Sequence, residues 1–307
     1  MQSDVRPIVV VGSINMDLVS RVPRIPGAGE TIFGRDFQTH PGGKGANQAV
    51  AVARLQYPVR MIGMLGNDSF GIQLRQHLTS EGVDTTSIGD SPAATGTASI
   101  LVDDAGENTI VVAPGANLDL TVEILQSNVE VIRNAGAVLT QLEIPIETVL
   151  CLAQLCSAHG IPLILDPAPA QKLPTELLRC VTWLTPNETE ARFYAAGASS
   201  DSEILDQLFR TGVRGIVLKR GALGSVLADG KNASISLGAP KVQAVDTTAA
   251  GDAFNGAFAV ALMQGLSLQE SGRFATAAAA ISVTRAGAQP SLASRGEVLA
   301  AIDRDPH

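Results

Sequence analysis

The sequence has few cysteines, and it lacks the features that mark membrane and secreted proteins. Cys151, Cys156 and Cys180 are its only cysteines, and they show no metal-binding or disulfide spacing. Two of them lie in an apolar run with helical spacing, so we expect reduced thiols in a cytoplasmic protein. No apolar run approaches the about 18 residues that favour a membrane span, so no membrane association is expected. The first residues do not resemble a signal peptide, because no basic segment precedes an apolar stretch and a cleavage site.

Clustered positive charge is also missing. The chain has 22 Lys and Arg residues against 30 Asp and Glu residues, which gives a net charge of −8 at pH 7. The basic residues are dispersed, whereas nucleic-acid binding needs them in patches, so we expect no nucleic-acid partner. If the ligand is a phosphate compound, local backbone donors must hold it, because the negative charge of the protein as a whole repels phosphate.

What the sequence does contain is a regular alternation of short apolar runs and helical patterns. Segments with 3.6-residue apolar spacing lie between the apolar runs, and this predicts βαβ units in a mostly parallel sheet with helices on both faces. We therefore expect one α/β domain over residues 1–307, with ligands at the carboxyl ends of the strands. The expected strands are residues 8–12, 60–65, 137–143, 162–169, 182–187 and 215–221.

Two stretches break this alternation, at about residues 13–40 and 95–113. Both alternate apolar and polar residues and contain turn signals such as "DDAGEN". They predict antiparallel strands separate from the main sheet. A small β-sheet lid over the strand ends would exclude water from a transfer reaction.

The strongest chemical signal is "VDTTAAGDAFNGAF", residues 245–258. Apolar residues at helical spacing predict a helix that begins near Ala249–Gly251, where unpaired amides and the macrodipole favour an anion. The small side chains of Ala249, Ala250 and Gly251 let a bulky anion approach the backbone. Asp252 either offsets the helix dipole or accepts a proton beside that anion. The helix terminus should depress its pKa, which would make it a weak base.

Three other motifs have both a chemical and a structural interpretation. In "GSINMD", Asn15 and Asp17 point the same way in extended chain and suit a polyol, although such residues are also common in turns. "PGGKGANQAVAVA" opens a helix without the Walker spacing, and Lys44 contacts a polar ligand or is solvated. In "TPNETE", Asn187 and Glu190 match a helix capping box.

Together, these motifs resemble the two signatures and the surrounding pattern of the PfkB carbohydrate kinase family. The resemblance implies a three-layer α/β/α sandwich around a mostly parallel sheet, with a small β-sheet lid. Within the family it points to ATP-dependent phosphorylation of D-ribose at the 5-hydroxyl. A kinase for 2-deoxyribose or another small sugar, or a catalytically silent sugar-binding homologue, are the alternatives. The motifs are "GGKGANQA", "DTTAAGDAFNG", "GSINMD", "QLEIP", "DPAPA", "TPNETE" and "VTRAGAQPS".

The resemblance also implies roles for individual residues. Asp252 becomes the base that deprotonates the sugar, and the amides of Ala249, Ala250, Gly251 and Asp252 become the anion hole. Sugar binding, together with Asp252, is assigned to Asn15, Asp17, Gly43, Lys44, Asn47 and Glu143. Nucleotide binding is assigned to Asn187, Lys219, Gly221, Gly224, Gly251 and Thr276.

Two ions and a second subunit are implied as well. Glu190 would organise Mg²⁺ through water. A monovalent cation, usually K⁺, would be held by Asp246, Thr248, Ser282, Arg285, Gly287 and Ser291, mostly through backbone oxygens. Pairing through open lid strands would give a homodimer. The sequence departs from the family pattern at Lys219, where many members have Thr, and at Thr276, where some have His.

Overall fold

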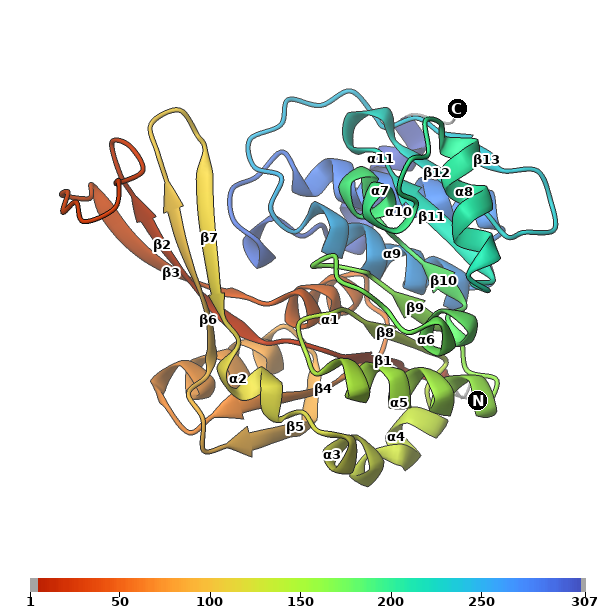
Figure 1. Ribbon diagram of the computed structural model, residues 1–307, viewed down its shortest axis with the longest axis horizontal. Helices are drawn as coiled ribbons and strands as arrows, with labels where there is room; N and C mark the ends of the chain where they lie inside the picture. Colours follow the sequence, from red (N-terminus) through yellow and green to blue (C-terminus); the bar gives the residue numbers. More distant parts are fainter. Residues whose placement is uncertain (1–4, 305–307) are drawn as a thin grey trace.

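A computed structural model describes residues 5–304, and a nine-stranded sheet runs through its centre (Figure 1). The strand order is β13-β12-β11-β10-β9-β8-β1-β4-β5. The strands from β5 to β11 in this order are parallel, whereas β12 and β13 form an antiparallel edge. Their bounds are β1 Ile8–Val11, β4 Val59–Gly66, β5 Asp84–Ser91, β8 Ala137–Thr140, β9 Leu163–Leu165, β10 Trp183–Leu184, β11 Gly215–Lys219, β12 Ser225–Ala228 and β13 Ile235–Leu237.

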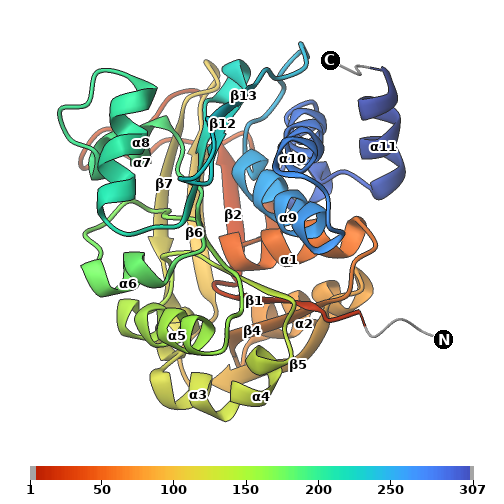
Figure 2. The same ribbon diagram turned by 90° about the vertical axis from the view of Figure 1, so that its right-hand side faces the viewer.

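Helices cover both faces of this sheet (Figure 2). On β1, Ile8 and Val10 belong to the core shared with α1, α2, α9, α10 and α11, whereas Val9 and Val11 belong to the core shared with α3 to α8. Successive strand side chains point to opposite faces, so a strand buried on both sides reads as a continuous apolar run. The predicted α/β sandwich is confirmed. The helices are α1 Lys44–Arg54, α2 Ser69–Ser80, α3 Val122–Ser127, α4 Val129–Arg133, α5 Ile146–Ala158, α6 Thr175–Cys180, α7 Glu188–Tyr194, α8 Asp201–Arg210, α9 Ala250–Met263, α10 Leu268–Ser282 and α11 Arg295–Arg304.

The predicted strands are present, but the edges of the sheet were not predicted. Each of the six apolar runs contains a strand, usually shorter than the run. The missing strands are β5, β12 and β13. The sequence of β5 is "DTTSIGDS", which lacks the apolar content of a buried strand because β5 lies at an edge.

A second sheet of four strands stands beside the carboxyl ends of the main strands and rises away from them in Figure 1. Its order is β3-β2-β6-β7, with β2 Asn15–Arg21, β3 Asp36–Gly42, β6 Gly96–Val102 and β7 Asn108–Ala113. The two hairpins are antiparallel, as expected. Parallel pairing of β2 with β6 joins them into one sheet, which the sequence pattern did not predict.

Helices α1 and α9 meet at close range on one face of the main sheet. A side-chain carbon at Gly256 would lie 2.7 Å from the Cβ of Ala51, so glycine is what permits the approach. The contact brings the first turn of α1 against the first turn of α9. These are the two helix starts that carry the family signatures.

The three cysteines lie on α5 and α6. All three thiols are free, and burial raises the pKa of Cys156 to about 12, because desolvation disfavours a thiolate. Within residues 5–304, no helix has both the length and the apolarity needed to cross a membrane.

Candidate active site

The amino end of α9 presents free backbone donors. The helix begins at Ala250, after Ala249 in the left-handed region with φ 59°. Among residues 5–304, the amides of Ala249, Gly251 and Asp252 find no hydrogen-bond partner, whereas Ala250 N donates to Thr247 O at 3.3 Å. Three of the four amides expected to form an anion hole are therefore available to a ligand.

The Asp252 carboxylate is buried and held by two amides from α1. Asn47 Nδ2 donates to Oδ2 at 2.9 Å, and Gln48 Nε2 donates to Oδ1 at 3.0 Å. Burial raises the pKa of Asp252 to about 6, although the Lys44 ammonium opposes the rise. The expectation of a depressed pKa was wrong, because the loss of water outweighs the helix terminus. A carboxylate of this kind is ionised at neutral pH and is a better base than an exposed one.

Two of the residues expected to bind a sugar, Asn15 and Asp17, lie on β2, just after the chain has left the main sheet at the end of β1. Asn15 is buried, and its Oδ1 accepts from Asn117 Nδ2 at 2.7 Å. Burial raises the pKa of Asp17 to about 7, with further contributions from Glu143 and Asp252. Gly43 has φ 89°, and a side-chain carbon there would lie 2.6 Å from Asn15 N.

Glu143 lies three residues after the end of β8, next to the residues expected to bind the sugar. Its Oε2 accepts from Ser13 Oγ at 2.5 Å and from Lys44 N at 3.4 Å. These contacts place Glu143 at the first turn of α1. The expected sugar-binding residues are thus brought together from β2, α1 and the segment after β8.

The site carries an excess of negative charge. Burial disfavours the Lys44 ammonium, yet the pKa of Lys44 is raised because carboxylates surround it. Two lysines, Lys44 and Lys219, face five carboxylates, which are Asp17, Glu143, Asp166, Glu190 and Asp252. This imbalance favours a bound cation.

A cavity of about 510 Å³ opens on the other side of the α9 terminus. The Oγ1 of Thr276 is buried and has no hydrogen-bond partner in the described part of the chain, so it is free to contact a ligand. Lys219 Nζ lies 3.1 Å from Asp166 Oδ1, and a side-chain carbon at Gly251 would come within 3.4 Å of that Nζ. The lining includes every residue assigned to the nucleotide, namely Asn187, Lys219, Gly221, Gly224, Gly251 and Thr276.

Asn187 and Glu190 form the capping box that their spacing predicted. Glu190 N donates to Asn187 Oδ1 at 2.9 Å, and Asn187 N donates to Glu190 Oε2 at 2.8 Å. Burial raises the pKa of Glu190, and the Asp166 charge adds to the rise. Structural capping and a role at the ligand are compatible, because Asn187, which holds the Glu190 carboxylate, lines the cavity.

The residues assigned to a monovalent cation lie on two segments that contact each other. Asp246 Oδ2 accepts from Gly287 N at 2.8 Å, and its Oδ1 accepts from Thr248 N at 2.9 Å. Burial alone would raise the pKa of Asp246, but these hydrogen bonds hold it below the ordinary value.

Three further residues of this set use their side chains elsewhere. Arg285 pairs with Glu297, Ser282 Oγ donates to Ala279 O, and Ser291 Oγ donates to Ala288 O. They can therefore offer backbone oxygens. In the described chain, no three His, Cys, Asp or Glu side chains converge as a metal site, so any ion would rely on such oxygens, on water or on phosphate.

Comparison with known proteins identifies the family. A model of the pfkB family of carbohydrate kinases matches residues 5–295. The chain belongs to this family. Ribokinase from Haemophilus influenzae is 42% identical over 299 residues, which span 96% of this chain and 97% of that protein. The structure of Arabidopsis thaliana ribokinase complexed with ribose and ATP superposes with a TM-score of 0.92 at 37% identity, covering 97% of this chain and 99% of the other.

A second solved relative gives the same result. Ribokinase from Thermotoga maritima superposes with a TM-score of 0.91 at 39% identity, with 97% of this chain and 99% of the other covered. The likeness therefore extends over both sheets of this pfkB-family kinase.

Some residues of the site were not predicted. Asp166 directly follows β9, and its Oδ2 accepts from Gln48 Nε2 at 3.2 Å, so Gln48 bridges Asp166 and Asp252. Gln141 follows β8, and its Nε2 donates to Gln48 Oε1 at 2.7 Å. The signal that could have found Asp166 and Gln141 was available, because ligands of such kinases bind where parallel strands end. Gln48 was overlooked beside Asn47 in the first signature.

Proposed function

We propose that the protein transfers the γ-phosphoryl group of ATP to the 5-hydroxyl of D-ribose, giving D-ribose 5-phosphate and ADP. The observation that carries the proposal is the position of Asp252. Its carboxylate lies at the free amides of α9, between the sugar-side residues and the nucleotide cavity. Asp252 accepts the hydroxyl proton while the oxygen bonds to phosphorus, and the bond from phosphorus to ADP breaks. Positioning and charge stabilisation dominate such a transfer.

The sugar is recognised by its hydroxyls. Carboxylates of Asp17 and Glu143 accept hydrogen bonds, while Asn15 and Asn47 offer amides that both donate and accept. Lys44 donates and offsets the surrounding negative charge. Gly43 leaves room for the sugar to approach the backbone. This set suits a polyhydroxylated ring, and deoxyribose would leave one of these partners unpaired.

The nucleotide binds in the cavity beside α9. Gly221 and Gly224, with φ of 52° and 88°, allow close backbone approach, and Thr276 contacts the base. Lys219 and Asn187 lie towards the phosphates, and the amides of Ala249, Gly251 and Asp252 receive the transferring group. Mg²⁺, organised by Glu190 through water, would neutralise phosphate charge, which fits the excess of carboxylates in the site.

A monovalent cation, K⁺, fits the segments around Asp246 and Gly287. The oxygen donors there are the type that hard cations prefer. Bound at this place, the ion would steady the loop that precedes α9 and so the amides that face the phosphoryl group. Asp246 joins the two segments, because its carboxylate accepts from Thr248 N on one and from Gly287 N on the other.

The four-stranded sheet acts as a lid and as the contact between two subunits of a cytoplasmic homodimer. Phe33 is 97% exposed and Phe37 is 62% exposed. Three consecutive residues of β7, Ile110, Val111 and Val112, are exposed as well. Such apolar surface on an open sheet is a place for association. Phe37→Asp should give a monomer in analytical ultracentrifugation, whereas Leu299→Asp on α11 should not.

A coupled ADP-release assay over a panel of pentoses, with and without K⁺, tests the proposed reaction. Ribose should give the highest kcat/KM, and 2-deoxyribose should be poorer by about tenfold or more, since one hydrogen-bonding group is lost. Equal or better turnover of 2-deoxyribose would reject the ribose assignment. No ADP release with any sugar would support a silent sugar-binding homologue.

A further inference from the structure

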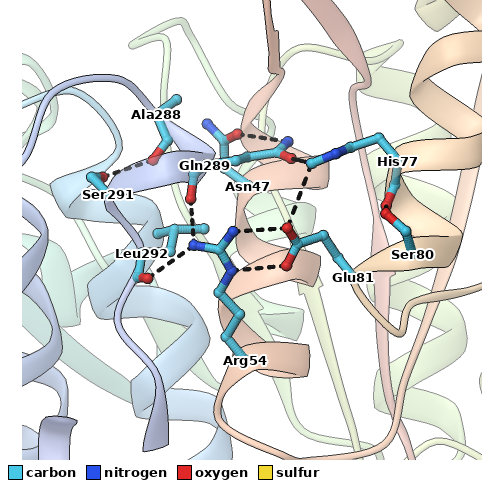
Figure 3. A network of polar contacts seen from close by, with 9 residues as sticks. All are labelled: Asn47, Arg54, His77, Ser80, Glu81, Ala288, Gln289, Ser291 and Leu292. Atoms are coloured by element: carbon cyan, nitrogen blue, oxygen red, sulfur yellow. Dashed lines mark hydrogen bonds and ion pairs between the residues drawn. The ribbon is translucent and has the colours of Figure 1, made fainter.

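A chain of side chains leads from the candidate base to a histidine on α2, outside the site described above. Figure 3 shows the part of this chain from Asn47 to His77. Asn47 joins Asp252 to Gln289, because Gln289 Nε2 lies 3.1 Å from Asn47 Oδ1. Gln289 Oε1 in turn lies 2.8 Å from His77 Nε2. Asn47 and Gln289 are buried, whereas the His77 side chain is 29% exposed. The chain therefore runs from the sugar site to the surface.

The hydrogen bonds in this chain have one mutually consistent set of directions when Asp252 is ionised and His77 Nε2 carries a proton. An ionised carboxylate only accepts, so Asn47 must present its amide nitrogen there. Its oxygen then faces Gln289, which must donate its own nitrogen. The Gln289 oxygen is left for His77, and the only group that satisfies it is an N–H on His77 Nε2. A flip of either amide would break two hydrogen bonds at once.

The surroundings of His77 favour the same arrangement. Its Nε2 also lies 4.0 Å from Glu81 Oε1, one turn along α2, so two acceptors face this nitrogen. Glu81 is held by Arg54, whose Nε and Nη2 donate to it at 2.8 Å each. The remaining Arg54 nitrogen, Nη1, donates to the backbone oxygens of Gln289 and Leu292 at 2.7 and 3.0 Å. Arg54 ends the helix that carries Asn47, so it keeps Gln289 at a set distance from Asn47.

We propose that His77 and Gln289 are positioning residues for phosphoryl transfer, which hold the Asn47 amide with its nitrogen towards Asp252 and the sugar. The inference rests on the proposed function, in which Asp252 is the base. When the chain is intact, Asp252 receives one more hydrogen bond in its ionised form. Without the His77 donor, the Gln289 oxygen loses its hydrogen bond, so Gln289 is held only through its nitrogen and Asn47 is oriented less firmly.

The pH profile of kcat/KM for ribose distinguishes this role from a structural one. Hydrogen bonds to the ionised form lower a carboxyl pKa, so His77→Leu should move the acid limb to higher pH by roughly half a unit. The other charges that face Asp252 are Lys44, Asp166 and Asp17, and none of them contacts His77. The KM for ribose should rise by about 3- to 10-fold, as for one lost hydrogen bond.

Two further variants control the measurement. His77→Gln keeps an N–H donor. It should return the acid limb to its wild-type pH and the KM for ribose to within about twofold of wild type. His159→Leu makes the same substitution at a histidine whose side chain, within residues 5–304, hydrogen-bonds with Arg133 alone, and it should change neither. A wild-type acid limb in His77→Leu, with only the melting temperature lowered, would overturn the proposal.

A direct readout needs no variant and no activity. Side-chain nitrogen NMR of the wild-type protein should show a proton on Nε2 of His77. The Nδ1–H tautomer would overturn the proposal, even if His77→Leu failed to fold. Because this signal does not depend on turnover, an enzyme that ignores ribose would refute the proposed function without deciding the role of His77.

Discussion

Lys219 and Asp166 form a buried ion pair across two strand ends, with Lys219 Nζ 3.1 Å from Asp166 Oδ1. Lys219 ends β11 at the nucleotide cavity, and Asp166 follows β9 and contacts Gln48. The pair thus connects the nucleotide side with the amide that holds Asp252. It also keeps the ammonium within reach of Gly251, where a phosphoryl group would sit.

We predict that Lys219→Met weakens both the fold and the nucleotide site. Leaving Asp166 buried without its partner should cost roughly 3–5 kcal/mol of unfolding free energy. The KM for ATP should rise and kcat should fall, because a cation beside the phosphates is lost. Adding Asp166→Asn should restore stability but not the KM for ATP. If the double variant recovers both, Lys219 serves the fold alone. Urea unfolding and steady-state kinetics measure the two effects.

Asp17→Asn should make the protein more stable above neutral pH and weaken its binding of ribose. The pKa of Asp17 is about 7 in the folded protein, above its ordinary value of 3.8, so the folded state binds more protons between these values. Stability is therefore lost as the pH rises through about 7, and the variant escapes this loss. Its melting temperature should exceed that of wild type at about pH 8 and match it at about pH 4.

Sugar binding by this variant should move the opposite way. The loss of a charged acceptor should raise the Kd for ribose by about 10- to 100-fold, measured by calorimetry. An unchanged Kd would place the sugar elsewhere. A melting temperature below that of wild type at the higher pH would show that Asp17 is not a strained, ionised group.

The cation account predicts faster turnover in K⁺ than in Na⁺, and a melting temperature that rises with K⁺. Asp246→Ala should remove both responses, because Asp246 joins the segments that hold Thr248 and Gly287. Asp229→Ala is the matched control, since Asp229 also accepts from the amide two residues on but lies in an exposed turn and joins no distant segment of the described chain. Indifference of the wild-type protein to both ions would rule out this reading of Asp246.

The elements carrying the chemistry were predictable because their signals are local. The start of α9 follows from Ala249, Gly251 and the apolar spacing after them, and it lies where expected. The capping box at Asn187 and Glu190 was likewise readable from three-residue spacing. Such features depend on neighbours in the chain, so a sequence pattern contains them.

What could not be predicted depends on residues far apart in the chain. The raised pKa of Asp252 results from burial, and its partners Asn47 and Gln48 are about two hundred residues away, with separations of 205 and 204. The parallel pairing of β2 with β6 joins two hairpins separated by α1, β4, α2 and β5. Gln289 reaches both Asn47 and His77 only after the last loop folds back. No local pattern encodes these contacts.

The central claim is that Asp252 is the base at the head of α9, and the pH dependence of kcat in wild type and Asp252→Asn tests it most directly. Wild-type kcat should fall as the pH drops below about 6, where the carboxylate takes up a proton. In Asp252→Asn, kcat should be lower by roughly 10²–10⁴-fold, the acid limb should vanish, and the Kd for ribose should change much less. Wild-type turnover by Asp252→Asn, or an unchanged acid limb in that variant, would contradict the account.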